Sequence, residues 1–283
     1  MSNHEPQRSP KYFCPIFNLK IVEEEEDSAE PTRVRIIEKK KPIKKFRFLA
    51  NTTVCGIRKK DLQSNAFTNM IFDEHVAGAF CRKYEDIPVI EFYDAPENQL
   101  ATLVENIVFA LRLFKEGDVF CKIIWAENHC HQMVLNPFYE LPSTIHRELY
   151  QFRVKEIDQI REIFEKITKT DFDKRKPLKI ARDRLNRSYG KSMLDEKIVD
   201  FMIGFEALFL RESSMCSGQI IGTGCSTLLG KTDEERNDIY NFLKKTYKLR
   251  NDIVHGSEID YSGIRETTLK LKEFLRKSIL NLL

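Results

Sequence analysis

The chain has 283 residues, of which 42% are hydrophobic and 31% are charged, and its formal net charge is +3. This length is typical of two domains, and the hydrophobic fraction is large enough to build their cores. The apolar runs are too short and too interrupted to span a membrane, and the seven cysteines lack the paired short spacings of a disulfide framework. We therefore expect a globular protein of the reducing cytoplasm, without a membrane segment.

The first 31 residues combine several prolines with an acidic run over Glu23–Asp27. This composition predicts a flexible acidic arm. From Arg33 to Phe48, lysines and arginines then alternate with aliphatic residues on both sides of Pro42, which predicts an exposed pair of strands. The basic side of these strands would either contact phosphate groups or protect a solvated sheet edge from aggregation.

A helix and a strand adjoin in the middle of the chain. Apolar residues recur at helical spacing over residues 97–115, and Gly117 stands where a helix stop is expected. Val119, Cys121 and Ile123 then alternate with other residues in a run that favours β-structure. Residues 32–140 are therefore predicted to form an α+β domain, whose role the sequence does not indicate.

Four residues near this strand are the closest approach to a metal-binding cluster, namely Cys121, His129, Cys130 and His131. Cys130 and His131 are adjacent, whereas zinc ligands close in sequence are usually separated by two or more residues. We therefore expect no metal site and no cofactor. Cys216 and Cys225 are expected to be packing residues, because no basic residue adjoins either thiol in sequence.

After Pro142 the pattern becomes helical and predicts an all-α bundle over residues 141–283, so the whole chain is α+β. Helices are predicted over residues 145–167, 179–188, 194–211, 232–256 and 264–283. The segment Ser217–Leu229 is a weaker helix, because each of its three glycines costs about 1 kcal/mol relative to alanine. The outer face of the second helix carries three candidates for contact with nucleic acid, Arg182, Arg184 and Arg187.

Arg250 and His255 stand five positions apart, just before Gly256 at the end of a predicted helix. On a regular helix this offset corresponds to about 140° of rotation. The two side chains therefore converge only if the helix end distorts or if two copies of the motif face each other. Asn251 lies one turn before His255 on the same face and could orient the imidazole.

Phosphodiester cleavage in RNA is a reaction that needs these two groups. A histidine can take a proton from the 2′-hydroxyl or give one to the leaving 5′-oxygen, while an arginine holds the phosphate and its developing charge. The pair also has a structural interpretation, because basic residues ahead of a C-cap glycine satisfy the last carbonyl groups and the helix dipole. The spacing alone does not choose between these interpretations.

The order of residues around the pair is more specific than its spacing. One stretch runs from Leu228 to Gly256, and an earlier series comprises Leu185–Ser188, Ile198–Asp200 and Phe205–Leu210. These stretches resemble the Apea-like HEPN family, and Ala110–Phe114 is similar to a segment that often precedes its domain. The resemblance covers the second half of the chain well and touches the first half.

The resemblance implies a helical HEPN bundle that dimerises and cuts RNA without metal, in a defence or toxin system with a regulatory or antitoxin partner. Arg250 and His255 would be the catalytic pair, with Asn251 and Asp252 as supporting residues beside it. Glu206 would be a buried supporting acid on the preceding helix. In place of Gly218–Gly224 the family is expected to carry a regular helix with basic residues, so packing or phosphate contact there is in question.

Two matters remain open in the sequence. A carboxylate in the apolar surroundings of Glu206 needs a cationic partner, which would be either Arg250 or one of Arg182 and Arg187. The bundle is either a ribonuclease or a noncatalytic module for dimerisation or nucleotide binding, with Arg250 and His255 in structural roles.

Overall fold

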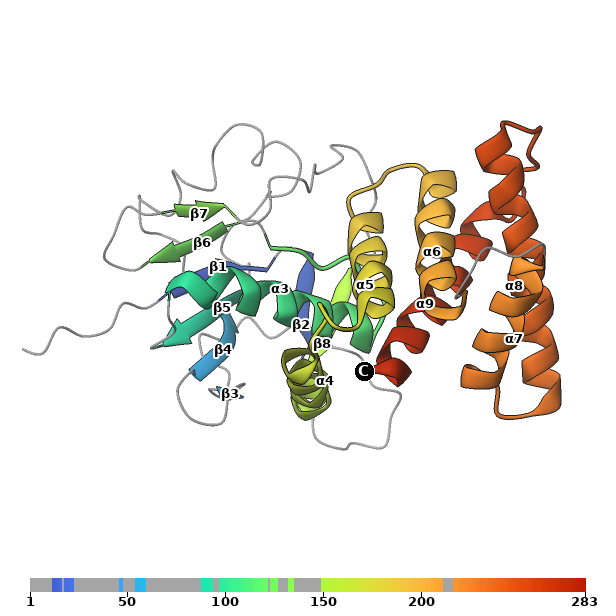
Figure 1. Cartoon of the computed structure of the whole chain (residues 1–283). Coiled ribbons are helices and arrows are strands. Elements are labelled where there is room, and N and C mark those ends of the chain that lie inside the picture. Colours follow the sequence, from blue (N-terminus) through green and yellow to red (C-terminus); the bar gives the residue numbers. More distant parts are fainter. Residues whose placement is uncertain are drawn as a thin grey trace, which may run out of the picture. The chain divides into compact units, whose positions relative to one another are not determined.

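The computed structural model describes residues 12–16, 18–22, 46–47, 54–59, 88–93, 97–121, 123–126, 132–134, 149–210 and 216–283. The chain divides into two compact units, one of residues 1–138 and 146–165 and the other of residues 139–145 and 166–283. The described part is mostly helical, with seven α-helices, and its strands all precede residue 154 (Figure 1).

The first unit contains an antiparallel sheet of six strands in the order β3-β4-β5-β1-β6-β7. Its strands are β1 (Tyr12–Pro15), β3 (Phe46–Arg47), β4 (Val54–Lys59), β5 (Pro88–Tyr93), β6 (Ile123–Ala126) and β7 (Gln132–Val134). The strand β1 lies in the middle of this order and pairs Tyr12 with both Phe92 and Ala126. Its position corrects the predicted flexible arm, because residues 12–15 lie inside a sheet.

A parallel pair of short strands, β2 (Leu19–Val22) and β8 (Tyr150–Arg153), forms a second sheet in this unit. Leu19 pairs with Tyr150, and the residues of β8 alternate between buried and less buried positions. The helix predicted over residues 145–167 is therefore wrong in its first part. The helix α4 begins only at Ile157 and runs to Lys169, because Tyr150 and Phe152 have a distant strand partner that no local pattern reveals.

The helix α3 (Glu97–Phe114) confirms the predicted helix of the first half. Its apolar face is buried at Leu100, Ile107 and Leu111, each at most 1% exposed. At its end, Lys115 forms an ion pair with Glu156, which also accepts a hydrogen bond from the backbone of Arg153. The end of α3 is thereby tied to the turn between β8 and α4.

Several predicted features lie wholly or partly outside the described residues. These are the acidic run Glu23–Asp27, the basic segment Arg33–Phe48 except for Phe46–Arg47, and the residues His129, Cys130 and His131. None of the helices that the structure describes has the length and hydropathy needed to cross a lipid bilayer.

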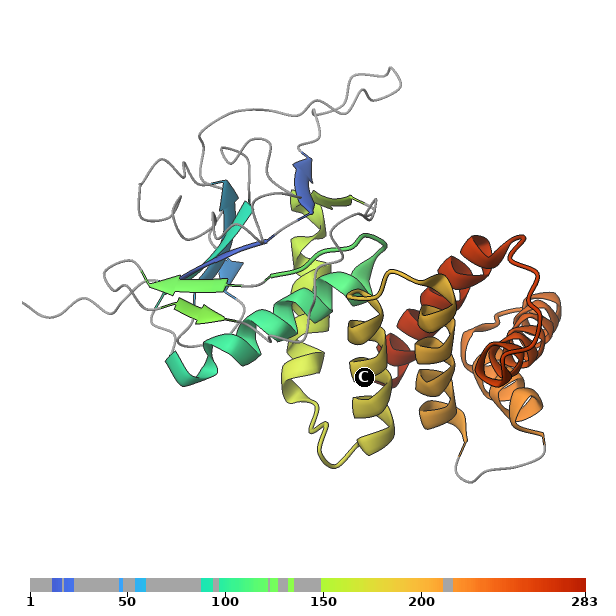
Figure 2. The same ribbon diagram turned by 90° about the horizontal axis from the view of Figure 1, so that it is seen from above.

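The second unit contains the helices α5 (Lys176–Ser188), α6 (Leu194–Phe209), α7 (Ser217–Leu229), α8 (Asp233–His255) and α9 (Ile264–Leu282). Within this bundle α5 lies at one end and the pair α7 and α8 at the other, with α6 between them (Figures 1 and 2). The helix α9 packs against α5, α6 and α7 through Leu271, Leu275 and Ile279, which are fully buried. The helices predicted from residue 179 onward are thus present in the bundle, whereas residues 146–165, which were predicted to belong to it, are part of the first unit.

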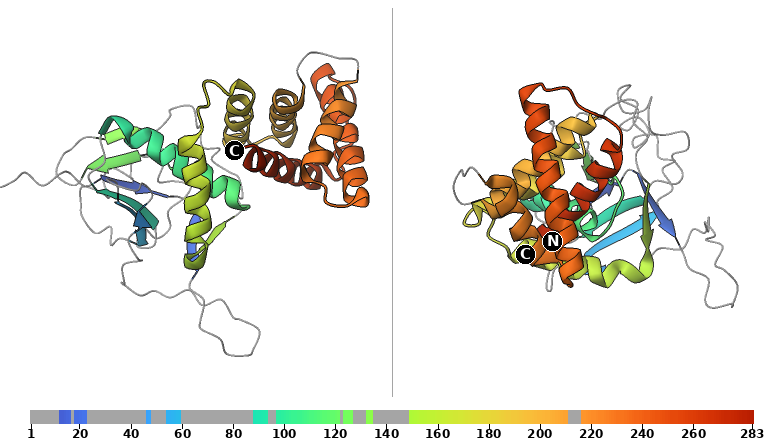
Figure 3. Two further views of the ribbon diagram at one scale, coloured as in Figure 1. Left: turned by 60° about the horizontal axis from the view of Figure 1, so that its bottom comes forward. Right: turned by 90° about the vertical axis from the view of Figure 1, so that its right-hand side faces the viewer.

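The helix α7 is regular despite its glycines, and it lies against α8 (Figure 3). A Cβ atom on Gly218 would lie 3.1 Å from the ring of Tyr247, and one on Gly222 would lie 2.9 Å from the ring of Tyr240. The two glycines therefore make room for two tyrosines of α8. Close approach of the helices offsets the unfavourable helix propensity that made this segment a weak prediction.

We predict that Gly222→Ala lowers the free energy of unfolding by about 1–2 kcal/mol, because overpacking against Tyr240 outweighs the gain of about 1 kcal/mol in helix propensity. Denaturant titration would measure the change. Thr223→Ala is the matched control, because Thr223 is the next residue of α7 and is exposed. Its stability should change by less than about 0.5 kcal/mol. A Gly222→Ala protein as stable as the parent would contradict this account of the interface.

Candidate active site

The helix α8 carries the candidate site in its last turns, and both of its ends are capped. Thr232 accepts a hydrogen bond from the backbone of Glu235 (3.2 Å), and Glu235 accepts one from the backbone of Lys231 (2.8 Å). At the other end Gly256 adopts φ 70°, its N–H donates to the carbonyl of Ile253, and that of Ser257 donates to Asp252. This C-cap ends the helix at His255.

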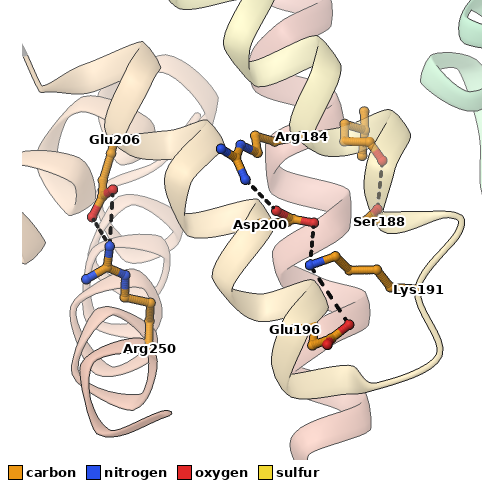
Figure 4. A network of polar contacts seen from close by, with 8 residues as sticks. Arg184, Ser188, Lys191, Glu196, Asp200, Glu206 and Arg250 are labelled. Carbon is orange, nitrogen blue, oxygen red and sulfur yellow. Dashed lines mark hydrogen bonds and ion pairs between the residues drawn. The ribbon is translucent and has the colours of Figure 1, made fainter. Parts of the chain in front are cut away.

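The Arg250 guanidinium is held by two side chains within the chain, Glu206 and Asn251, of which Figure 4 shows Glu206. One nitrogen lies 3.3 Å and 3.5 Å from the two carboxylate oxygens of Glu206, and the other donates to the amide oxygen of Asn251 at 3.0 Å. The ring of Tyr247 lies 5.9 Å from the guanidinium carbon. Arg250 is therefore the cationic partner of Glu206, which decides the alternative that the sequence left open.

The Glu206–Arg250 pair joins the last turn of α6 to α8. The side chains of Arg250 and Glu206 are 21% and 23% exposed, so the pair is partly solvated and contributes modestly to stability. A half-buried Glu206 differs from the buried acid that the resemblance implied. The Nε atom of Arg250 is buried and makes no hydrogen bond within the described part of the chain.

His255 is exposed at the end of α8, and Asp252 is half-buried on the turn before it. The helix remains regular from Asp233 to His255, so the offset of about 140° between Arg250 and His255 is preserved. A distorted helix end does not bring the two side chains together. The oxygen of Asn251 orients Arg250, whereas the sequence had suggested that Asn251 would orient His255.

The three arginines predicted to bind nucleic acid lie on α5, at the other end of the bundle from α8 (Figures 1 and 2). Arg182 stacks on the ring of Phe172 at 4.7 Å, and Arg184 forms an ion pair with Asp200 at 2.9 Å. Arg187 is exposed. The structure therefore does not bring these arginines together with Arg250 and His255, and Arg184 has a packing role.

The Asp200 carboxylate on α6 is the center of a polar cluster to which the sequence assigned no role (Figure 4). Its side chain is only 2% exposed, and Lys191 lies 3.0 Å from its second oxygen. Glu196 lies 3.9 Å from the same lysine. An acidic residue at a position where α6 is otherwise apolar, between Val199 and Phe201, is the signal that could have revealed this cluster.

Cys225 lies in the core of the bundle, with its sulfur 3.6 Å from the hydroxyl of Ser278. Burial raises the pKa of the Cys225 thiol to about 11. Cys216, by contrast, is exposed at the start of α7, so the packing role predicted for it is wrong. The packing role predicted for Cys225 agrees with this burial, since a buried neutral thiol is a poor nucleophile.

Comparison with protein-family models, with curated proteins and with solved structures gives no significant match for this chain.

We predict that Arg184→Ala lowers the free energy of unfolding by about 1–2 kcal/mol, because Asp200 would stay buried with only Lys191 as its partner. Arg187→Ala, on the same helix, should change it by less than about 0.5 kcal/mol because Arg187 is exposed. Thermal and denaturant unfolding of the two variants would measure the difference. Equal stability of the two variants would contradict the packing role of Arg184.

We predict that iodoacetamide at pH 8 modifies Cys216 in the folded protein and leaves Cys225 unmodified. With a pKa of about 11, only roughly one Cys225 thiol in a thousand would be ionised at that pH. Peptide mapping by mass spectrometry would give the two extents of modification. Reaction of Cys225 as fast as that of Cys216 without unfolding would contradict the packing described for α7.

Proposed function

We propose that the chain is a metal-independent endoribonuclease of the HEPN type, whose active site combines Arg250 of one copy with His255 of a second copy. The observation that carries this proposal is the state of the two side chains at the end of α8. Arg250 is oriented by Glu206 and Asn251, and His255 is exposed on another side of the same helix.

In this proposal His255 transfers the protons of the cleavage reaction. The imidazole accepts the proton of the 2′-hydroxyl as its oxygen attacks the phosphorus, or the imidazolium gives a proton to the departing 5′-oxygen. The products are a 2′,3′-cyclic phosphate and a free 5′-hydroxyl, so that one P–O bond forms and one breaks. Neither step needs a metal ion.

Arg250 stabilises the charge that grows on the phosphate oxygens in this reaction. An arginine presents its donors in a planar fork, and Glu206 and Asn251 occupy donors on its two terminal nitrogens. Its orientation is thus set before substrate binds, which reduces the entropy lost in the transition state. Glu206 and Asn251 are positioning residues in this proposal.

The need for a second copy follows from helical geometry. Because α8 is regular up to His255, Arg250 and His255 of one chain point in directions about 140° apart. In a dimer with a twofold axis, a contact between Arg250 of one copy and His255 of the other would occur twice. We therefore propose a homodimer with two equivalent sites.

The finer assignment of the fold and of the biological role belongs to the same proposal. The first unit would be an α+β domain that selects a target or senses a signal, and the second unit would be the HEPN bundle. The protein would cut RNA in a cytoplasmic defence or toxin system, controlled by a regulatory or antitoxin partner.

One observation favours the rival proposal, a noncatalytic module for dimerisation or nucleotide binding. The guanidinium of Arg250 is already engaged by Glu206, so the arginine also joins α6 to α8. Substitution of Arg250 would then affect stability without any loss of activity. The two proposals differ in what happens to RNA.

We predict that the purified full-length protein cleaves labelled RNA in the presence of EDTA. His255→Ala should lower the rate about 10²–10⁴-fold, the range for loss of a general acid or base. Arg250→Lys keeps the charge but loses the planar fork, and should lower the rate about 10–100-fold. Gel analysis of the products would also show the cyclic phosphate ends.

Arg161→Ala is the matched control, because Arg161 forms an exposed ion pair with Asp158 that contributes little to stability. This variant should cleave at the parent rate. Circular dichroism would establish that each variant is folded. Absence of cleavage by the folded parent dimer, or cleavage by His255→Ala at the parent rate, would support the noncatalytic alternative.

A further inference from the structure

The facing helices α7 and α8 include two segments with an unusual distribution of charge. Thirteen residues of α7, Ser217–Leu229, contain no charged residue. Thirteen residues of α8, from Ile239 to Asn251, contain Lys244, Lys245, Lys248 and Arg250 and no acidic residue. Because 31% of the whole chain is charged and acids nearly equal bases in number, this surface is locally basic.

Three polar side chains form a line along the exposed face of α8. Lys244, Lys248 and His255 are all exposed, and on a regular helix they lie within about 40° of one another. From Lys244 to His255 the line is about 16 Å long, at 1.5 Å per residue. Among the described residues, neither lysine lies within ion-pair distance of an acid.

Lys245 lies beside this line but is less available for contact with a ligand. Its charge contributes to lowering the pKa of Asp260, although the hydrogen bonds from Ser262 to that carboxylate are the larger cause. Asp252 follows Lys248 by one turn and is half-buried. The two lysines of the line therefore supply most of its positive charge.

Two tyrosines run beside the lysines, on the side of α8 that faces α7. Tyr240 and Tyr247 are half-buried, and they lie against Gly222 and Gly218 respectively. They are two helical turns apart, or about 10 Å. At each of these two positions α7 has a glycine, so no Cβ atom of that residue stands against the ring.

Each tyrosine also has a cation beside its ring. The nitrogen of Lys244 lies 5.9 Å from the centroid of Tyr240, and the guanidinium carbon of Arg250 lies 5.9 Å from that of Tyr247. These distances are near the outer limit of a cation–π interaction, so each contact is weak and a ligand would displace it at little cost. The same arrangement of a glycine of α7, a tyrosine of α8 and a cation of α8 thus occurs twice along the part of α8 that precedes His255.

We propose that this surface, the lysine and tyrosine track of α8, binds single-stranded RNA and leads it to His255. The lysines would contact successive phosphates, and the tyrosine rings would stack on unpaired bases. Paired bases do not offer their faces for stacking, so the track discriminates against a duplex. This inference rests on the proposed ribonuclease function, whose substrate it describes more closely.

The test measures binding without cleavage, in the full-length His255→Ala protein with a fluorescein-labelled RNA of twelve unpaired nucleotides. Adding Lys244→Ala and Lys248→Ala should weaken binding at least about tenfold at low salt and lower the slope of log K against log salt by about 2. Tyr240→Leu should weaken binding about 5–100-fold at any salt concentration, because a stacking surface is lost while the apolar volume remains. Fluorescence anisotropy would give the constants.

The matched control replaces two exposed lysines elsewhere in the bundle, Lys176 of α5 and Lys277 of α9, with alanine. This variant has the same net charge as the track variant and should bind within about twofold of the parent, which separates a local effect from a general one. A duplex of the same sequence should bind more weakly than the single strand. Equal loss of RNA affinity in the two double-lysine variants would overturn the proposal that the track binds single-stranded RNA. Tighter binding of the duplex than of the single strand would also overturn it.

Cleavage assays distinguish this inference from the proposed function. If the parent protein cleaves RNA, and the track variants bind and cleave RNA as the parent does, the proposed role of the track is wrong and the proposed ribonuclease function is supported. If RNA binds through the track but is never cleaved, the proposed ribonuclease function is wrong and the proposed RNA-binding surface is supported. Binding of an acidic peptide in preference to RNA would overturn the assignment of the ligand.

Discussion

The regular geometry of α8 is the constraint on which the interpretation of this molecule depends. The helix is capped by Thr232 at its start and ends at Gly256, and between these caps it does not distort. Each side chain of its last turns therefore points in a fixed direction around the helix axis. Arg250 faces α6, Tyr247 faces α7, and Lys248 and His255 face solvent. One helix thus presents some of its polar side chains to neighbouring helices and others to solvent.

The helix α6 holds the bundle together through two carboxylates as well as through its apolar face. Phe201 and Phe205 are fully buried, while Asp200 pairs with Arg184 of α5 and Glu206 pairs with Arg250 of α8. The first pair is almost closed to solvent at its acid, and the second is partly open. The difference lies in the acids, because Asp200 is 2% exposed and Glu206 is 23% exposed, whereas Arg184 and Arg250 are 30% and 21% exposed. Burial of the carboxylate suits a structural role for Asp200.

Local patterns in the sequence predicted most of the helices. Apolar spacing located α3, α5, α6, α8 and α9, and the cap residues Thr232 and Gly256 located both ends of α8. Strands β1 and β8 were missed because they are stabilised by distant partners, namely β5 and β6 for β1 and β2 for β8. The local sequence of a short apolar segment does not identify a distant strand with which it pairs.

The candidate site was predictable in its residues but not in its contacts. The order of residues singled out Arg250, Asn251, His255 and Glu206, yet three arginines remained as possible partners for Glu206 until the fold was known. Arg182, Arg184 and Arg187 form no single stripe on a regular helix, because Arg184 is about 160° from Arg182 around the axis. Spacing along α5 thus argued against a common binding face, and the engagement of Arg184 by Asp200 gives the physical reason.

The central claim is that the active site needs Arg250 of one copy and His255 of another. Mixing Arg250→Ala and His255→Ala proteins in equal amounts, with exchange of subunits, tests this claim most directly. After exchange, half of the dimers would contain one subunit of each variant, and each of these dimers would have one intact site of its two. The account therefore predicts about a quarter of the parent's ribonuclease activity, although each variant alone is inactive. An inactive mixture, in which differently tagged subunits are shown to have exchanged, would contradict a shared site.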